Sequence, residues 1–163
     1  MKIFEDPSRR YYIRELAREI KISPSNTIKI IDELKKERII RKEKKRHSVE
    51  ITANTDNILF IHTKRMFNLV KIYESEIIEH LVKEYNPKAI ILFGSYSRGE
   101  DVKRSDIDIA IITDEKKIIG LENFEKRLGR KIHLLPMKYK EITDELYSNL
   151  INGIVLYGYM DAK

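Results

Sequence analysis

The sequence predicts an α/β (α+β) fold, in which a C-terminal domain with a small mixed sheet follows a small helical module and a long connecting helix. Three observations predict it. Short apolar runs alternate with glycine turns in the C-terminal half, a helical pattern continues without interruption over residues 57–85, and basic residues concentrate in the N-terminal third. We therefore expect a division into residues 1–56, 57–85 and 86–163.

Composition excludes several classes of protein. Of the 163 residues, 42% are hydrophobic and 36% are charged, which is typical of a folded globular chain. The absence of cysteine excludes a disulfide framework, a thiol nucleophile and a cysteine-based zinc site. With no signal-peptide pattern and no apolar run near about 18 residues, we expect a cytoplasmic protein that does not enter a membrane.

The net charge of +6 is unevenly distributed. Residues 1–56 hold 15 Lys or Arg against 10 Asp or Glu, whereas the remaining residues hold 17 against 16. The N-terminal third therefore carries +5 of the total, which favours a separate module with an acidic partner such as nucleic acid.

The segment from Phe93 to Ile112, FGSYSRGEDVKRSDIDIAII, is the most informative part of the chain. The apolar run before it, KAIILF, predicts a buried strand that stops at Gly94, where a backbone without Cβ allows a ligand to approach closely. Ser95 offers a hydroxyl, and a short helix over residues 96–100, ended by Gly99, directs its first N–H groups to the same point. This arrangement favours a bound phosphate.

A second strand over residues 106–112 carries two carboxylates. Residues two apart on a strand project from the same face, so Asp106 and Asp108 lie side by side, roughly 7 Å apart along the backbone. Adjacent carboxylates repel each other unless a hard cation binds between them, and Mg²⁺ or Mn²⁺ suits oxygen ligands. Next to a phosphate turn, this pair indicates metal-assisted phosphoryl or nucleotidyl transfer.

The pattern Gly94-Ser95, Arg98-Gly99 and Ser105-Asp106-Ile107-Asp108 resembles the signature of the DNA polymerase β-like nucleotidyltransferases, especially their minimal archaeal and bacterial members. The resemblance covers about residues 87–158. It implies that Gly94, Ser95 and Arg98 bind a nucleoside triphosphate and that Asp106 and Asp108 bind the metal. In this family a third carboxylate on a later strand activates the accepting hydroxyl.

His133 occupies the position of that third carboxylate, on the expected strand KIHLL over residues 131–135. An imidazole can accept a proton, but it supplies neither the negative charge nor the hard oxygen of a carboxylate. We therefore expect weaker Mg²⁺ binding. Two interpretations of His133 stay open, a catalytic base and a side chain that only packs or hydrogen-bonds in the sheet.

The N-terminal module has the pattern of two helices joined by a turn. Apolar residues at helical spacing predict a helix from about residue 12 to residue 19 or 20. Ser23 is a suitable cap and Pro24 a suitable first residue for a second helix through Arg38, with Ile28, Ile31 and Leu34 facing inward. Polar residues lie near its exposed start: Ser25, Asn26, Thr27 and Lys29.

Two strands, over residues 39–43 and 48–54, follow these helices and are joined by the basic sequence KKRH, from Lys44, Lys45 and Arg46 to His47. The whole module resembles a winged helix-turn-helix. The resemblance implies that the second helix reads bases of duplex DNA while the hairpin contacts phosphates. The alternative is a small helical domain whose charges are simply solvated.

One feature departs from that pattern, because residues 1–4 are too short for the usual first helix before Asp6-Pro7. Another element must cover that face, and the helix over residues 57–85 is the candidate. Its apolar residues recur on one stripe, which we expect to face the module or a second chain in a homodimer. The stripe contains Met66, Leu69, Val70, Tyr73, Ile77 and Leu81.

We expect the C-terminal domain to be completed by helices near residues 121–128 and 143–150 and by a terminal strand over residues 154–157 that packs onto the sheet. The overall prediction is a nucleotidyltransferase with a DNA-binding module. Two other functions stay open: a DNA-binding regulator whose transferase domain is catalytically weak, and an antitoxin-like protein that acts with a small helical partner.

Overall fold

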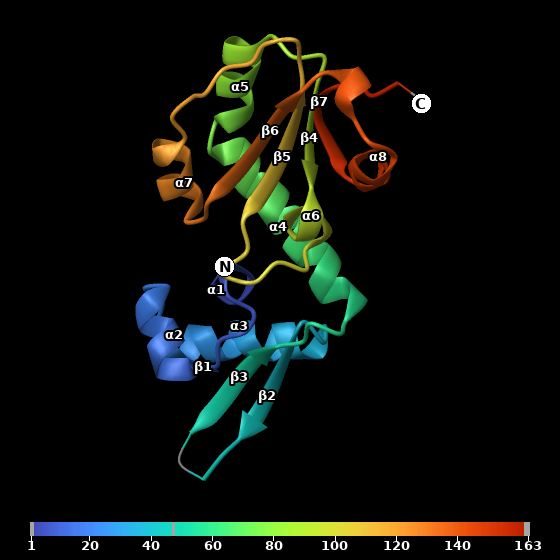
Figure 1. Cartoon of the computed structure of the whole chain (residues 1–163). Coiled ribbons are helices and arrows are strands. Elements are labelled where there is room, and N and C mark those ends of the chain that lie inside the picture. Colours follow the sequence, from blue (N-terminus) through green and yellow to red (C-terminus); the bar gives the residue numbers. More distant parts are fainter. Residues whose placement is uncertain (1, 47, 162–163) are drawn as a thin grey trace. The chain divides into compact units, whose positions relative to one another are not determined.

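The computed structural model describes residues 2–46 and 48–161 (Figure 1). The chain forms two compact units, Met1–Lys64 and Arg65–Lys163, and the division falls within helix α4 (Ile58–Glu74). Each unit has its own sheet and its own buried residues.

The N-terminal unit contains the predicted pair of helices and the predicted hairpin. Its elements before α4 are α1 (Lys2–Glu5), β1 (Tyr11–Tyr12), α2 (Ile13–Glu19), α3 (Pro24–Lys36), β2 (Ile40–Lys44) and β3 (Val49–Ala53). The three strands pair antiparallel in the order β1-β3-β2. The predictions of helix, turn, helix and hairpin are confirmed as secondary structure, whereas β1 was not predicted.

Helix α3 begins as the sequence predicts but buries a different residue near its start. The Ser23 hydroxyl accepts a hydrogen bond from the Asn26 backbone N–H at 3.3 Å, which confirms the cap. Thr27 and Ile31 are buried, whereas Ile28 is 39% exposed, so the prediction that Ile28 faces inward was wrong. Ile31 and Leu34 keep their predicted inward positions, and Thr27, one turn before Ile31, is buried in place of Ile28.

The tip of the hairpin is basic and exposed over Lys44, Lys45 and Arg46. Lys45 Nζ donates a hydrogen bond to a carboxylate oxygen of Glu43 at 2.7 Å. His47, which the sequence places in the same tip, lies outside the described residues.

The beginning of α4 packs against the short N-terminal helix α1. Phe4 packs against Phe60 of α4, with ring centroids 5.3 Å apart. The buried Lys64 Nζ donates a hydrogen bond to the Phe4 carbonyl at 2.8 Å. Tyr11 ties the same segment through its hydroxyl, which donates to the Lys2 carbonyl at 2.8 Å, and burial raises the pKa of Tyr11 to about 12.

The single helix predicted over residues 57–85 is two helices, α4 and α5 (Ile77–Tyr85), so that prediction was wrong at residues 75–76. The Ser75 hydroxyl donates to the Ile72 carbonyl at 2.7 Å, and Glu76 adopts a left-handed conformation with φ 62°. A serine side chain that bonds to a nearby carbonyl competes with the helical ladder, and a left-handed residue ends it. No proline or glycine marks this break in the sequence.

The predicted stripe along residues 57–85 is interrupted at the same point. Ile77 and Leu81 of α5 are fully buried, whereas Met66, Val70 and Tyr73 of α4 are 69%, 52% and 48% exposed. The change of direction at Glu76 gives the two helices different buried faces. Within the described residues, no helix is long and apolar enough to cross a membrane.

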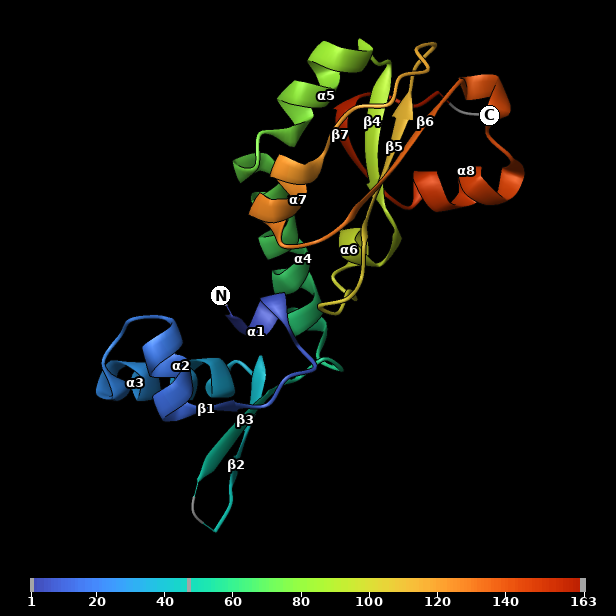
Figure 2. The same ribbon diagram turned by 60° about the vertical axis from the view of Figure 1, so that its left-hand side comes forward.

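The C-terminal unit is built on a four-stranded mixed sheet in the order β6-β5-β4-β7 (Figure 2). Strands β5 and β6 are parallel, and the other neighbouring pairs are antiparallel, which confirms the predicted small mixed sheet. The elements after α5 are β4 (Ala89–Phe93), α6 (Gly94–Arg98), β5 (Ile107–Ile112), α7 (Glu122–Leu128), β6 (Ile132–Met137), the 3₁₀ helix η1 (Tyr139–Glu141), α8 (Asp144–Ile151) and β7 (Ile154–Gly158).

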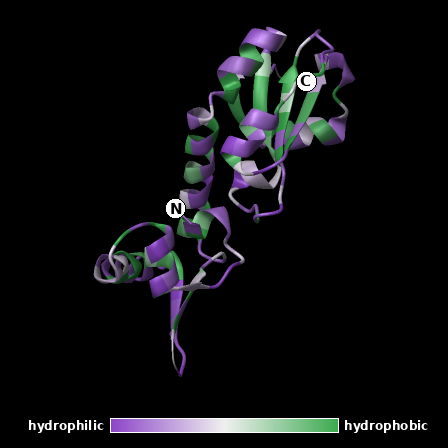
Figure 3. Ribbon diagram, turned by 90° about the vertical axis from the view of Figure 1, so that its left-hand side faces the viewer, coloured by the Kyte–Doolittle hydropathy of each residue, from purple (hydrophilic) through white to green (hydrophobic). Residues whose placement is uncertain are grey.

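Helices cover both faces of this sheet, so its central strands are apolar nearly throughout (Figure 3). Ile107, Ile109 and Ile111 of β5 pack with α4, α5 and α7 on one face. Ala110 and Ile112 pack on the other face with residues of α8. The sheet places the end of β4 next to the start of β5, and this end of the sheet carries the predicted motif.

Candidate functional site

The turn after β4 has the local structure that the sequence predicts. Gly94 has φ +70°, a conformation that L residues rarely adopt, and Gly99 ends the short helix α6 in a left-handed conformation with φ 74°. The helix begins at Gly94, two residues earlier than expected. A buried side chain that the sequence did not single out fixes the turn, because the Ser97 hydroxyl donates to the Gly94 carbonyl at 2.8 Å.

The backbone of Gly94 lies directly against the carboxylate of Asp108. A Cβ atom placed on Gly94 would lie 2.3 Å from Oδ2 of Asp108, a distance that real Cβ atoms do not tolerate. Asp108 is on β5, opposite Phe93 at the end of β4. The antiparallel register therefore brings the glycine turn and this carboxylate together.

The two carboxylates differ in their surroundings. Asp108 lies within β5, and its side chain is 28% exposed. Asp106 is the last residue before the strand and is exposed. Asp108 shares a strand face with Ala110 and Ile112, while Ile107, Ile109 and Ile111 face the opposite core, as predicted.

His133 lies beside Asp108 because β6 runs parallel to β5 in a register that pairs these two residues. The His133 Nδ1 and Asp108 Oδ1 atoms are 3.2 Å apart, and the His133 side chain is 58% exposed. An imidazole with that exposure is not packed in the core of the sheet. The structure thus brings together Gly94, Asp108 and His133.

Ser95 and Arg98 follow Gly94 in the same short helix. Ser95 is half-buried. Arg98 is exposed and directs its Nε to a carboxylate oxygen of Glu100 at 2.7 Å. The guanidinium of Arg98 is therefore already paired with a residue two positions along the same loop.

A buried polar network, which sequence reasoning missed, holds the loop between α6 and β5. Asp101 is fully buried and pairs with Arg130, whose NH2 lies 2.7 Å from Oδ2 of Asp101. The Asn68 side-chain amide donates to Oδ1 of Asp101 at 2.6 Å and to the Tyr96 carbonyl at 2.9 Å. We define Asn68, Asp101 and Arg130 as the loop anchor.

The loop anchor reaches the residue that precedes Asp106. Arg130 donates through NH1 to the carbonyls of Ser105, at 3.1 Å, and Val102. Its guanidinium also lies over the Tyr96 ring, 5.5 Å from the centroid, and burial raises the pKa of Tyr96. Asp101 and Arg130 are 29 positions apart in sequence, so no local pattern could have revealed the pair.

The donor atoms of the site suit Mg²⁺, which does not need a site built from protein ligands alone. Among residues 2–46 and 48–161, no group of three or more His, Asp or Glu side chains is placed to hold a metal ion. Mg²⁺ commonly binds through one or two carboxylates, with water and substrate phosphates as the remaining ligands. Asp106 and Asp108 fit that pattern.

Comparison with known proteins identifies the family. The family model described as Polymerase beta, Nucleotidyltransferase matches residues 75–161, which is more than half of the chain and includes Gly94, Asp106, Asp108 and His133. The chain therefore belongs to the polymerase beta nucleotidyltransferase family.

Three curated proteins of Methanocaldococcus jannaschii, whose names describe them as proposed protein adenylyltransferases, are similar to this chain. One is 42% identical over 65 residues, covering 36% of this chain and 65% of the relative. Another is 43% identical over 60 residues, covering 34% and 61%, and a third is 39% identical over 62 residues, covering 35% and 72%. The chain thus spans less than two thirds of the length of the first two relatives. No solved structure matches it.

The close approach at Gly94 leads to a first prediction, that Gly94→Ala displaces Asp108 whereas Gly129→Ala does not. Both glycines are left-handed, with φ +70° and +67°, so each substitution costs roughly 1–2 kcal/mol of backbone strain. Only at Gly94 does the new Cβ meet another residue, since nothing lies within 4 Å at Gly129. Gly94→Ala should lower the free energy of unfolding further and shift the carboxyl-carbon NMR signal of Asp108. Equal losses, with an unchanged Asp108 signal in both variants, would contradict the geometry.

Proposed function

We propose that this chain is a nucleotidyltransferase that binds a nucleoside triphosphate with Mg²⁺ and transfers a nucleoside monophosphate to an acceptor hydroxyl. The observation that carries the proposal is the contact between the Gly94 backbone and Asp108, inside the segment that matches the family. The names of the relatives make ATP the proposed nucleotide and a protein side chain the proposed acceptor.

Each residue of the site has a proposed role. Gly94 and Ser95 would receive the triphosphate, because a left-handed glycine leaves backbone N–H groups open to close approach. Asp106 and Asp108 would hold Mg²⁺, which when bound supplies positive charge that offsets the charge of the phosphates. Arg98 would join them only after exchanging Glu100 for a phosphate oxygen.

The proposed reaction forms one bond and breaks one. The acceptor oxygen bonds to the α-phosphorus of ATP, and the bond from that phosphorus to the bridging oxygen breaks, so pyrophosphate leaves with the bonding electrons. The hydroxyl proton must pass to a base. His133, 3.2 Å from Asp108, is near enough to the carboxylates to accept it, and this is the catalytic interpretation of that side chain.

An adenylyl-transfer assay tests the proposal. The purified chain is incubated with ATP labelled at the α-phosphate, Mg²⁺ or Mn²⁺, and a cell extract, and protein-bound label is measured. We expect label in acceptor proteins that disappears in the double variant Asp106→Asn/Asp108→Asn, together with metal-dependent ATP binding measured by calorimetry. Unchanged Mg²⁺-ATP affinity in the double variant would show that the site is assigned to the wrong residues.

The variant His133→Asp separates the interpretations of His133 in the same assay. If the missing carboxylate limits catalysis, the substitution restores a charge and an oxygen ligand, so metal affinity and transfer should both rise. Loss of an existing activity would identify the imidazole as the working base. If neither quantity changes, His133 has no role in the reaction.

We also propose that the N-terminal unit is a winged helix-turn-helix that binds duplex DNA. The order of α2, α3 and the β2–β3 hairpin supports this proposal, as do the exposed Ser25, Asn26 and Lys29 on α3. The prediction that Thr27 lies exposed with these residues was wrong, because Thr27 is buried and its hydroxyl donates to the Ser23 carbonyl at 3.0 Å. We therefore do not propose that Thr27 contacts bases.

The proposed DNA contacts differ in kind between the hairpin and α3. Replacing Lys44, Lys45 and Arg46 by Gln should weaken binding to all sequences and flatten the slope of log affinity against log salt by up to about 3, if each side chain contacts one phosphate. Asn26→Ala should change the preference among sequences more than the salt slope. Fluorescence anisotropy with labelled duplexes measures both. The proposal fails if no duplex binds even at low salt.

The assays of adenylyl transfer and DNA binding also bear on the two alternative functions, a regulator and an antitoxin-like protein. DNA binding without any adenylyl transfer would favour a regulator, or an antitoxin-like protein, with a weak transferase domain. A homodimer through residues 57–85, a small helical partner protein, and domain limits of 1–56, 57–85 and 86–163 also stay predictions.

A further inference from the structure

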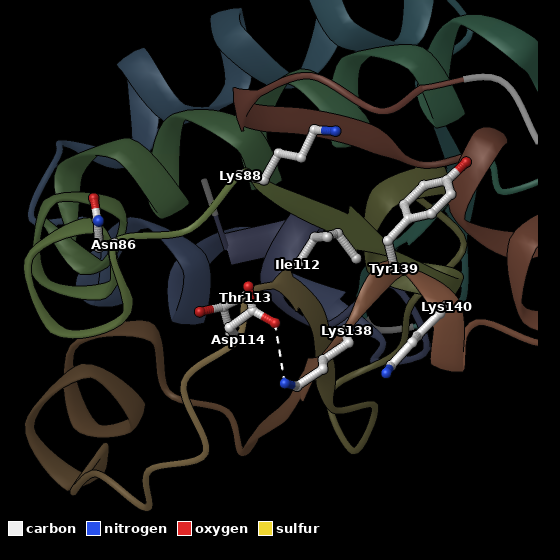
Figure 4. A pocket seen from close by; sticks show the side chains of 8 residues that line it. All are labelled: Asn86, Lys88, Ile112, Thr113, Asp114, Lys138, Tyr139 and Lys140. Atoms are coloured by element: carbon white, nitrogen blue, oxygen red, sulfur yellow. Dashed lines mark ion pairs between the residues drawn. The ribbon is translucent and has the colours of Figure 1, made fainter.

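Figure 4 shows the residues that line a pocket of about 510 Å³. The pocket lies where Ala89 pairs with Ile112, at the end of the C-terminal sheet opposite to Gly94 and Asp108. Its lining comes from the segment before β4, the end of β5 and the segments that follow β5 and β6. Lys88 at the pocket and Gly94 at the turn are six positions apart, which is roughly 20 Å along an extended strand. The pocket is therefore separate from the site proposed for nucleotidyl transfer.

The charge of the pocket is predominantly positive. Lys88, Lys138 and Lys140 line it, and Asp114 is the acidic residue of the lining. Pockets of this volume are of the size that holds small molecules. Because the lining holds three lysines and one acidic residue, the pocket favours an anion over a neutral ligand, and over a cation above all.

Contacts within the unit hold two of these lysines in place. Lys138 Nζ lies 3.1 Å from Oδ1 of Asp114, the pair that Figure 4 marks with a dashed line. Lys88 forms an ion pair with Asp161, and the hydrogen bond in that pair raises the pKa of Lys88, so its ammonium stays charged at neutral pH. The same ammonium lies over the Tyr139 ring, 5.8 Å from the centroid.

Lys140 differs from the other two, because its ammonium makes no ion pair within the described part of the chain. It is exposed and follows Tyr139 in the short helix η1. A ligand that carries two negative charges can therefore engage Lys140 while it also attracts Lys138, which shares its charge with Asp114. A singly charged anion would offer less to these two groups.

We propose that this pocket binds a dianionic phosphate group, either as free phosphate or as the terminal phosphate of a nucleotide. The ammonium groups of Lys138 and Lys140 contact the phosphate oxygens, while Lys88, whose ammonium points away from these two in Figure 4, adds positive charge at longer range. Tyr139 forms a wall for any group attached to the phosphate. The pocket offers one carboxylate, so binding needs no divalent metal, which distinguishes it from the site at Asp106 and Asp108.

Titration of the full chain in EDTA tests this proposal independently of the proposed transfer reaction. Inorganic phosphate, AMP and adenosine are added separately, and binding is followed by calorimetry and by amide NMR shifts. We expect phosphate and AMP to bind and to shift the amides of Thr113, Asp114 and Lys140, whereas adenosine does not bind. Equal affinities assign the site to free phosphate, and tighter AMP binding assigns it to a nucleotide.

Two double variants with the same charge change complete the experiment. Lys138→Gln/Lys140→Gln removes one paired and one unpaired ammonium from the pocket and should weaken binding by about tenfold or more. Lys71→Gln/Lys126→Gln is the control, since Lys71 is likewise paired, with Glu74 at 3.4 Å, and Lys126 is exposed on α7. The proposal is overturned if the wild-type chain shows no saturable binding, if both variants weaken it equally, or if the shifts centre on Gly94 and Ser95.

Discussion

The buried ion pair between Asp101 and Arg130 is the interaction on which the candidate site depends. The two side chains are 0% and 7% exposed, so each needs the other as a partner, and the Asn68 amide satisfies a further oxygen of Asp101. Removing one member of a buried pair typically costs about 3–5 kcal/mol, because it leaves an uncompensated charge. The pair therefore gives the loop between α6 and β5 one strongly favoured conformation, and that loop ends at Asp106.

The register of the strands in the sheet positions Asp108 and His133. Phe93 is opposite Asp108 across β4 and β5, and Asp108 is next to His133 across β5 and β6. A slip of one residue would turn Asp108 toward the core formed by Ile107, Ile109 and Ile111, where a carboxylate has no partner. The apolar residues that bury the sheet are thus the same residues that fix the direction of the acidic side chain.

Much of this could be predicted from the sequence, because the signals were local. The apolar strand before Gly94, the alternation of Asp106 to Ile112 and the Ser23-Pro24 cap each depend on residues a few positions apart. The features that the sequence did not predict depend on residues far apart in the chain, or on a side-chain hydrogen bond that competes with those of the helix backbone. Asp101 and Arg130 meet only in the fold, and the break at Ser75 and Glu76 contains neither Gly nor Pro. Thr27 and Ile28 are neighbours that both lie about one turn before Ile31, and the polar one of the two is buried.

Hydrogen exchange at the loop tests most directly whether the Asp101–Arg130 pair holds the site together. In the native structure the Val102 amide donates to the Ser105 hydroxyl at 3.0 Å, and the Ser105 amide donates to the Val102 carbonyl at 2.9 Å. Asp101→Asn should speed exchange of these two amides by about tenfold or more, since a loss of about 1.4 kcal/mol is a factor of ten, while the strand amides of β4 change less. Glu100→Gln, which breaks only the exposed pair with Arg98, should leave them unchanged. Unaltered exchange at Val102 and Ser105 in Asp101→Asn, or equal acceleration in both variants, would contradict the claim.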